Sequence, residues 1–185
     1  FAAGAISSAS LLVDGANAAA AAAAATAAGL PLGLHLNLTE GPLPAPNSLT
    51  DGDGQRLGKL GLRAVLAAGR VTRKDIAGEI RRQFDRFIDL TGELPSHVDG
   101  HHHIHVEALV AEVLAPIMAR EYGVHCVRLP REAGLDTLPG DAEYEADFQC
   151  GVVRSAQAAE AVFAAAGLYS TGAFLGQSTM GMRLT

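Results

Sequence analysis

The sequence predicts an α/β fold with a parallel β-sheet, arranged as a barrel or as part of one. Apolar segments of strand length alternate with segments of helical periodicity along most of the 185 residues. Clusters of glycine, proline, aspartate and asparagine separate these segments, as they do at turns. No internal repeat or interdomain linker interrupts the alternation, so we expect a single domain over residues 1–185.

The first predicted unit is a strand, an alanine-rich helix and a second strand. Residues 6–13 are apolar with interspersed serines, which favours a buried strand. Residues 16–28 predict a helix that ends at Gly29, because glycine is the usual residue just past a helix C-terminus. Residues 32–38 predict the next strand. This order implies a parallel crossover between the two strands.

A long loop and two helices follow. Residues 41–58 are rich in proline, glycine and aspartate, and a loop of this length in a compact domain is either functional or mobile. Residues 60–68 predict a short helix. Thr72, with Asp75 three residues later, predicts the start of a longer helix that ends at Gly92. The apolar stripe of that helix comprises Ile76, Ile80, Phe84, Phe87, Ile88 and Leu90.

The second half continues the alternation. A histidine-rich segment after Pro95 predicts a strand over residues 97–105, and residues 107–122 predict a helix that Pro116 is expected to kink. The last predicted elements are a strand over residues 124–129, a helix over residues 157–166 and a strand over residues 172–175.

Composition narrows the class of protein. The chain is 49% hydrophobic with a formal charge of -6, which suits a globular cytoplasmic protein, and no basic cluster points to a nucleic-acid partner. The alanine tract over residues 18–25 is too short to span a membrane. No secretory signal, GxSxG elbow, P-loop or dinucleotide fingerprint is present. Cys126 and Cys150 lack CxxC spacing, so neither a disulfide framework nor a thiolate zinc site is expected.

Five histidines lie within residues 97–105. Imidazole is the commonest metal ligand, and in an extended segment alternate side chains share one face. That face would carry His97, Asp99, His101, His103 and His105, with His102 pointing away. Core histidines paired with the backbone, or an exposed polar tract, are the alternative. Metal or catalytic use is favoured because burying several imidazoles without a charged partner is costly.

His35 lies near the end of another predicted strand. Ligands of parallel α/β folds sit at the carboxyl ends of strands, so His35 and the histidine segment are expected to converge there. Two imidazoles and a carboxylate would form an open site for a divalent metal. Glu40 is a candidate ligand or general base, or a hydrogen-bonded loop carboxylate. Arg128 is a candidate for binding an anionic intermediate or a sugar hydroxyl, with a surface ion pair as the alternative.

Two motifs together resemble a known family. Residues 33–41 read Gly-Leu-His-Leu-Asn-Leu-Thr-Glu-Gly, and residues 97–105 read His-Val-Asp-Gly-His-His-His-Ile-His. This pair is similar to the YdjC-like carbohydrate deacetylases, the chitooligosaccharide deacetylase group. The resemblance extends nearly end to end, with weaker similarity at residues 7–13, 57–59, 128–130 and 173–179.

The resemblance implies a TIM-barrel-like (β/α) fold, a divalent metal ion, Mg or Zn, and removal of N-acetyl groups from an acetylated amino sugar or chitooligosaccharide. By motif, His35 and His101 correspond to metal ligands. The same comparison implies that Asp99, His103, His105 and Arg128, together with His97, orient the ligands or contact the substrate. A homodimer is expected at the level of the family, with no membrane partner.

The family pattern also places groups outside this sequence. It expects paired aspartates, one a metal ligand and one the base, on a strand before Phe1, and a His-Pro-Gly segment after Thr185. The barrel is therefore expected to be incomplete at both ends, and the catalytic base to lie before Phe1. Three functions remain open: a metal-dependent carbohydrate deacetylase, a non-catalytic metal- or sugar-binding relative, and an amidohydrolase-type enzyme acting on a non-sugar amide.

Overall fold

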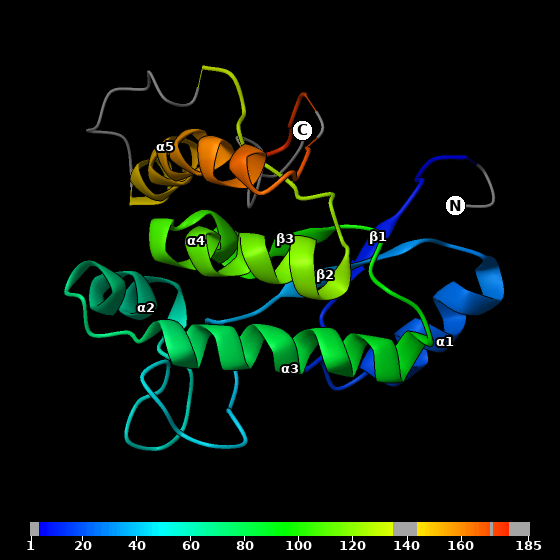
Figure 1. Cartoon of the computed structure of the whole chain (residues 1–185), viewed down its shortest axis with the longest axis horizontal. Helices are drawn as coiled ribbons and strands as arrows, with labels where there is room; N and C mark the ends of the chain where they lie inside the picture. The colour runs from blue at the N-terminus through cyan, green and yellow to red at the C-terminus, as the bar shows by residue number, and fades with distance from the viewer. Residues whose placement is uncertain (1–3, 135–143, 171, 178–185) are drawn as a thin grey trace.

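The computed structural model describes residues 4–134, 144–170 and 172–177, and it contains a three-stranded parallel sheet with helices (Figure 1). Strands β1 (Ala9–Leu11), β2 (Leu32–Leu36) and β3 (Val98–Gly100) lie side by side in that order. Each pair is parallel, as a strand–helix–strand order requires. The predicted α/β class with a parallel sheet is confirmed.

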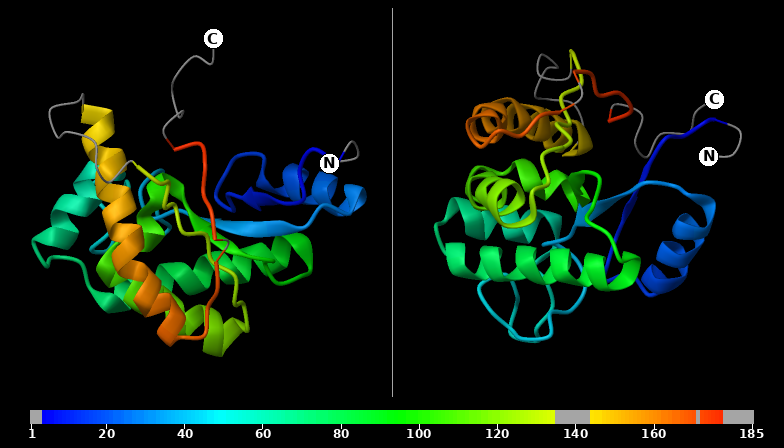
Figure 2. Two further views of the ribbon diagram at one scale, coloured as in Figure 1. Left: turned by 90° about the horizontal axis from the view of Figure 1, so that it is seen from above. Right: turned by 45° about the vertical axis from the view of Figure 1, so that its right-hand side comes forward.

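The helices follow one another along the outside of the sheet (Figure 2). α1 contacts α3, α3 contacts α4, and α4 contacts α5, while α3 also packs on β2. Each crossover therefore places its helix over the sheet and buries one face of it. The helices are α1 (Ala18–Ala28), α2 (Gly58–Ala67), α3 (Arg73–Thr91), α4 (Ala108–Pro116) and α5 (Tyr144–Ala165).

The strand register separates apolar from polar side chains. Leu34 pairs with Val98, and both are completely buried in the hydrophobic core. His35 pairs with Asp99 one residue further along, so these two side chains lie on the opposite face of the sheet. Ser10 lies on the same polar face, because it pairs with Gly33, two residues before His35. The alternation in the sequence thus places polar groups of three strands together.

Three helix ends lie at the residues that the sequence predicts, at Gly29, Thr72 and Gly92. Thr72 accepts a hydrogen bond from the Asp75 amide at 3.1 Å, and Gly29 and Gly92 end α1 and α3 with φ of 62° and 75°. The Asp75 carboxylate has a further contact, since it accepts from the Ser48 hydroxyl at 2.6 Å. This bond attaches the long loop over residues 41–57 to the first turn of α3.

The predicted strand over residues 97–105 is too long. β3 ends at Gly100, and a 3-10 segment, η1 (His101–Val106), follows it. His102 and His103 adopt left-handed backbone conformations with φ of 50° and 55°, so the expected sharing of one face by alternate residues fails beyond Gly100. Tertiary contacts hold this conformation, because Arg63 Nη2 donates to the His102 carbonyl at 2.7 Å.

Other elements differ from the prediction in their bounds or in their regularity. Residues 124–129 form no regular strand and join the sheet through isolated parallel bridges, in which Val127 pairs with Val98 and Cys126 pairs with Tyr169. Residues 172–175 do not form a strand, α5 begins before residue 157, and residues 178–179 lie outside the described ranges. The helix expected over residues 107–122 is present, but it changes at Pro116 from α-helix to a π-helical segment, η2 (Ile117–Tyr122).

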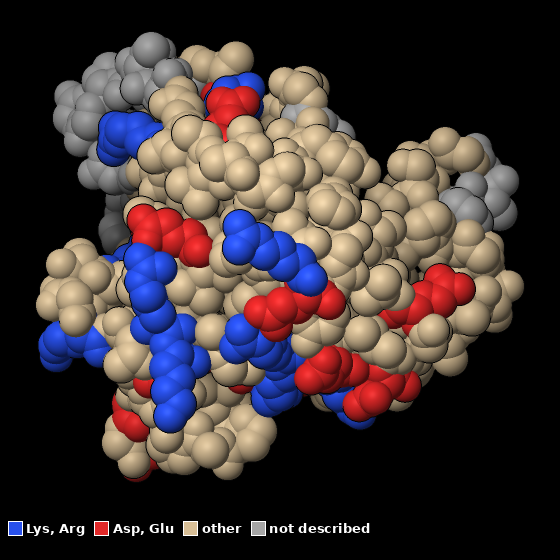
Figure 3. All heavy atoms as spheres, viewed as in Figure 1, with Lys and Arg blue, Asp and Glu red and all other residues tan. Residues whose placement is uncertain are grey.

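Charged side chains of both signs alternate along α3 on the face shown in Figure 3. Arg81 pairs with Glu121 at 2.7 Å, and Arg73 pairs with Glu112. Such exposed pairs contribute little to stability individually. Within the described ranges, no helix combines the length and the apolar character needed to cross a lipid bilayer.

Replacing Gly100 with alanine is expected to destabilise the protein by about 1–3 kcal/mol, because overpacking forces buried groups to move. A Cβ atom at Gly100 would lie 2.4 Å from Nδ1 of His105, whose side chain is completely buried. Urea unfolding followed by circular dichroism measures this loss. Gly78→Ala is the control, because a Cβ atom at that position meets nothing within 4 Å. Equal effects of the two changes would contradict the close packing at Gly100.

Candidate functional site

The two histidines that the sequence proposes as metal ligands lie next to each other. His35 comes from β2 and His101 from the first residue of η1, and their ring centroids are 5.4 Å apart in an edge-on arrangement. Both lie at the carboxyl ends of parallel strands, where ligands of such folds bind. The expected convergence of the two motifs is therefore present in the structure.

Asp99 is the central carboxylate of this site, and its residue is only 2% exposed. His35 Nδ1 donates to Oδ1 at 2.7 Å, and Ser10 donates to Oδ2 at 2.8 Å. Arg128 forms an ion pair with Oδ2 at 2.8 Å. Burial alone would raise the pKa of Asp99, but the bond from His35 and the charge of Arg128 hold that pKa well below its usual range. Asp99 therefore stays ionised and fixes the His35 tautomer, leaving the Nε2 lone pair for a ligand.

A second cluster contains Glu40, His101 and His102. His101 Nε2 lies 3.0 Å from one Glu40 oxygen, and His102 Nε2 lies 3.6 Å from the other. Each of the three offers a ligand atom within 4.8 Å of the other two, so this set is able to hold a metal ion. The bond to His101 lowers the pKa of Glu40, whereas burial lowers the pKa of His102. The sequence placed His102 away from the site, but its left-handed backbone turns the ring toward Glu40.

His103 and His105 lie deeper in the protein. His105 donates from Nε2 to the Arg128 carbonyl at 2.7 Å and so ties η1 to the segment that carries Arg128. Nδ1 of each ring is buried without a hydrogen-bond partner among the described residues. Burial lowers the pKa of His103 to about 3 and the pKa of His105 to about 4, so both rings are neutral at pH 7.

These two pKa values predict destabilisation in mild acid. The unfolded chain binds protons at histidine near pH 6.5, while the folded rings resist protonation down to about pH 4. The stability that the two neutral rings contribute is therefore fully present above the histidine pKa of the unfolded chain. It is lost as the pH decreases below that pKa. We expect the free energy of unfolding to be about 2–4 kcal/mol smaller at pH 5 than at pH 7.

Urea titrations at the two pH values measure this difference. His105→Gln should remove about half of it, because one of the two buried imidazoles is then absent. Replacement of His125, which is exposed, should leave the difference unchanged. A free energy of unfolding that does not depend on pH in this range would contradict the neutral state of the buried rings.

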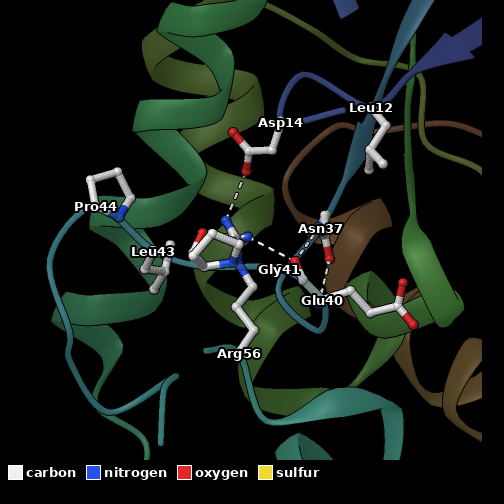
Figure 4. Close-up of a pocket in the computed structure, with 9 residues that line it drawn as sticks. Leu12, Asp14, Asn37, Glu40, Gly41, Leu43, Pro44 and Arg56 are labelled. Carbon is white, nitrogen blue, oxygen red and sulfur yellow. Dashed lines mark hydrogen bonds and ion pairs between the residues drawn. The ribbon is translucent and has the colours of Figure 1, made fainter. Parts of the chain in front are cut away.

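A cavity of about 510 Å³ opens beside Glu40 (Figure 4). Its wall is made by the segments that follow β1 and β2, together with Arg56 from the long loop. Arg56 is completely buried and donates to the carboxylates of Asp14 and Glu79 at 2.8 and 2.6 Å. The residues that line the cavity are Leu12, Asp14, Asn37, Glu40, Gly41, Pro42, Leu43, Pro44 and Arg56. Glu40 thus belongs both to this cavity and to the histidine cluster.

The sequence missed some groups that build the site. Ser10 donates to Asp99 and also contacts His97 Nε2 at 3.2 Å, and the strand register would have placed it there. The position of Arg56 has no comparable pattern, because it reaches the site from a loop of irregular structure. His97 itself lies at the start of the strand, near Ser96, rather than among the candidate ligands.

Comparisons with known proteins find one family model and several relatives that match this chain. The family model described as YdjC-like protein matches residues 1–185. A carbohydrate deacetylase of Mus musculus is 41% identical and one of Homo sapiens 40% identical, each over 100% of this chain. A chitooligosaccharide deacetylase of Klebsiella pneumoniae (strain 342) is 37% identical over 72% of the chain and 53% of its own length.

The chain spans only part of these relatives, 61% of the mouse protein and 58% of the human one. A crystal structure from Enterococcus faecalis V583, described as a cellobiose-phosphate cleavage protein, has a TM-score of 0.57 and 21% sequence identity. It covers 82% of this chain and 54% of its own, and it supports the α/β fold alone. Because the family model matches every residue, the chain belongs to the YdjC-like protein family.

Proposed function

We propose that this protein removes N-acetyl groups from an acetylated amino sugar or a chitooligosaccharide, using a divalent ion, Mg or Zn, held by His35 and His101. One observation carries the proposal: the buried Asp99 fixes His35 beside His101 at the carboxyl ends of two parallel strands. The deacetylase names of the relatives support the reaction class. We also propose that the sheet is part of a (β/α) barrel.

The donor groups fit such an ion. His35 donates from Nδ1 to an ionised carboxylate, which orients the ring and makes Nε2 a better ligand. Imidazole nitrogens suit zinc, and neighbouring carboxylate oxygens suit either ion. A divalent ion at this place would supply Lewis acidity toward an amide oxygen and lower the pKa of water.

The residues of this chain would orient the ligands, keep Asp99 ionised and exchange a proton with a bound molecule. Asp99 keeps His35 in one tautomer, and Arg128 and Ser10 keep Asp99 ionised and fixed. Glu40 is 60% exposed on its side chain and lies 3.0 Å from His101, where it is placed to exchange a proton with a bound molecule. The paired aspartates that the family resemblance expects before Phe1 would complete the ligands and supply the base.

A metal-binding relative without hydrolase activity is the second candidate. The observation that favours it is the cluster of Glu40, His101 and His102, which can hold an ion without His35. An enzyme acting on a non-sugar amide would use the same groups at the site. It would differ from a sugar deacetylase in its substrate.

Acetate release by the full-length protein from di-N-acetylchitobiose tests the proposal. We expect release that stops with EDTA and returns when Mg or Zn is added back. A panel of acetylated amino sugars and simple N-acetyl amides separates a sugar deacetylase from a general amidohydrolase. Absence of release from every acetylated amino sugar, at full metal loading, would refute the proposed function and favour the binding protein.

A further inference from the structure

We infer that His97 is a positioning residue that acts on Asp99 through Ser10. Its ring reaches Ser10 because the strand between them carries a glycine, Gly33. We call Ser10, Gly33 and His97 the supporting row. This row orients Asp99 and leaves metal coordination to the two histidine ligands. The inference deepens the proposed function and rests on it, because it assumes that an ion lies at those ligands.

The supporting row follows from the register of the three parallel strands. Ser10 pairs with Gly33, and the register between β2 and β3 places Gly33 opposite His97, the residue before β3. His35 and Asp99 form the pair two residues further along these strands. Side chains two residues apart on a strand share a face, so the supporting row and the row of His35 and Asp99 lie together on the polar face of the sheet.

Gly33 leaves the space that the His97 ring occupies. A Cβ atom at Gly33 would lie 2.4 Å from Cε1, 2.5 Å from Nε2 and 2.7 Å from Cδ2 of that ring. A side chain at this position would therefore overlap the imidazole. Gly33 lies inside β2 and its φ is not positive, so backbone conformation does not require a glycine here. A glycine inside a strand often marks the close approach of another group, and here that group is the His97 ring.

The available protons fix the direction of each hydrogen bond. Ser10 has one hydroxyl proton and donates it to Asp99 at 2.8 Å, because an ionised carboxylate only accepts. Toward His97 the same oxygen must accept, so His97 Nε2, at 3.2 Å, is the donor. Ser10 is exposed, and water would otherwise compete for its hydroxyl. The bond from His97 therefore favours the orientation in which Ser10 donates to Asp99.

Ser96 holds the other nitrogen of the His97 ring. Its Oγ lies 3.0 Å from His97 Nδ1, and burial lowers the pKa of His97, so the ring is neutral at pH 7 and Nδ1 accepts. Ser96 Oγ also lies 2.9 Å from the Leu32 carbonyl, which keeps the Ser96 amide as a donor, at 2.8 Å, when the hydroxyl turns to His97. The donors then run in one direction, from Ser96 through His97 and Ser10 to Asp99. Hydrogen bonds in such a chain strengthen one another.

Isothermal titration of the full-length protein with Zn or Mg tests this route. His97→Ala should weaken binding about threefold to tenfold, less than the change of about 10–100-fold expected for a group that contacts a ligand directly. The same change should have no effect once Ser10→Ala is present, but its full effect beside Ser10→Thr, which keeps the hydroxyl. His125→Ala, at an exposed histidine, is the control and should leave binding unchanged. Effects of His97→Ala and Ser10→Ala that add fully would overturn the inference.

Gly33→Ala tests the space for the ring separately. Its Cβ atom should displace the His97 imidazole and weaken metal binding at least as much as His97→Ala does. In the His97→Ala background it should have no further effect on metal affinity, because the ring that it would meet is absent. Urea unfolding of each variant shows that the protein titrated is folded. Equal effects of Gly33→Ala with and without His97 would contradict the contact between the two residues.

Nitrogen-15 NMR of the full-length protein without added metal separates this inference from the proposed function. His97 should show one tautomer, with a proton on Nε2 and none on Nδ1. Ser10→Ala and Gly33→Ala should each give the averaged signals of a ring that exchanges between both tautomers in water. If neither Zn nor Mg binds, the proposed function fails, and these spectra still decide whether His97 donates to Ser10. Averaged signals from His97 in the unsubstituted protein would overturn the inference.

Discussion

Replacing His35 or His101 with alanine is expected to reduce acetate release from an acetylated amino sugar by about 10³-fold or more, because a lost metal ligand removes several kcal/mol of transition-state stabilisation. The two rings lie 5.4 Å apart at the carboxyl ends of β2 and β3. The proposed function has both rings hold one ion, so either change alone should have nearly the full effect. The ratio kcat/KM of the full-length variants, at saturating metal, measures the loss.

His125→Ala is the matched control for this prediction. His125 is exposed, and its Nδ1 lies 3.2 Å from the Gly167 carbonyl. Its removal should change kcat/KM by less than about twofold, since among the described residues its ring makes no hydrogen bond or ion pair with the site. Variants of His35 and His101 that keep activity close to the unsubstituted protein would contradict the assigned ligands.

Asp99→Ala is expected to cost about 3 kcal/mol of stability, at the low end of the range for breaking a buried ion pair, because Arg128 keeps some contact with solvent. The Arg128 side chain is 28% exposed and would lose its partner at 2.8 Å. Asp99→Asn keeps the shape of the side chain but removes its charge. It should weaken metal binding about 10–100-fold, because His35 loses the carboxylate that orients it.

Urea unfolding of a double variant tests the electrostatic origin of that cost. Adding Arg128→Met to Asp99→Ala should recover part of the lost stability, since no uncompensated charge then remains. Asp89→Ala, at an exposed position of α3, should change the free energy of unfolding by less than about 0.5 kcal/mol. A loss for Asp99→Ala as small as that of the control would contradict the role of Asp99 as the centre of the site.

Much of the fold follows from local patterns. Strands β1 and β2, the alanine-rich α1 and the start of α3 at Thr72 all obey rules of periodicity and capping. The segment over residues 101–106 does not, because two successive residues, His102 and His103, adopt left-handed conformations that local preference disfavours. Arg63, far away in the sequence, holds the His102 carbonyl, and such a contact has no local pattern.

The candidate site likewise has one part that local sequence patterns predict and another part that depends on tertiary contacts. The pairing of His35 with Asp99 follows from two alternating strands in parallel register, so the sequence is sufficient to propose it. The approach of His102 to Glu40 depends on the bend after Gly100, and the extended interpretation of that segment placed His102 on the wrong side. The cavity beside Glu40 depends on Arg56, whose partners come from three separate elements.

Metal binding by single variants tests the central claim most directly, because His101 belongs to two alternative sets of ligands. Isothermal titration of the full-length protein with Zn or Mg should show one ion whose binding is lost in His35→Ala and His101→Ala. Binding should persist in His102→Ala and Glu40→Gln. Loss of binding in His102→Ala and Glu40→Gln, with His35→Ala unaffected, would place the ion on the other set and contradict the proposed site.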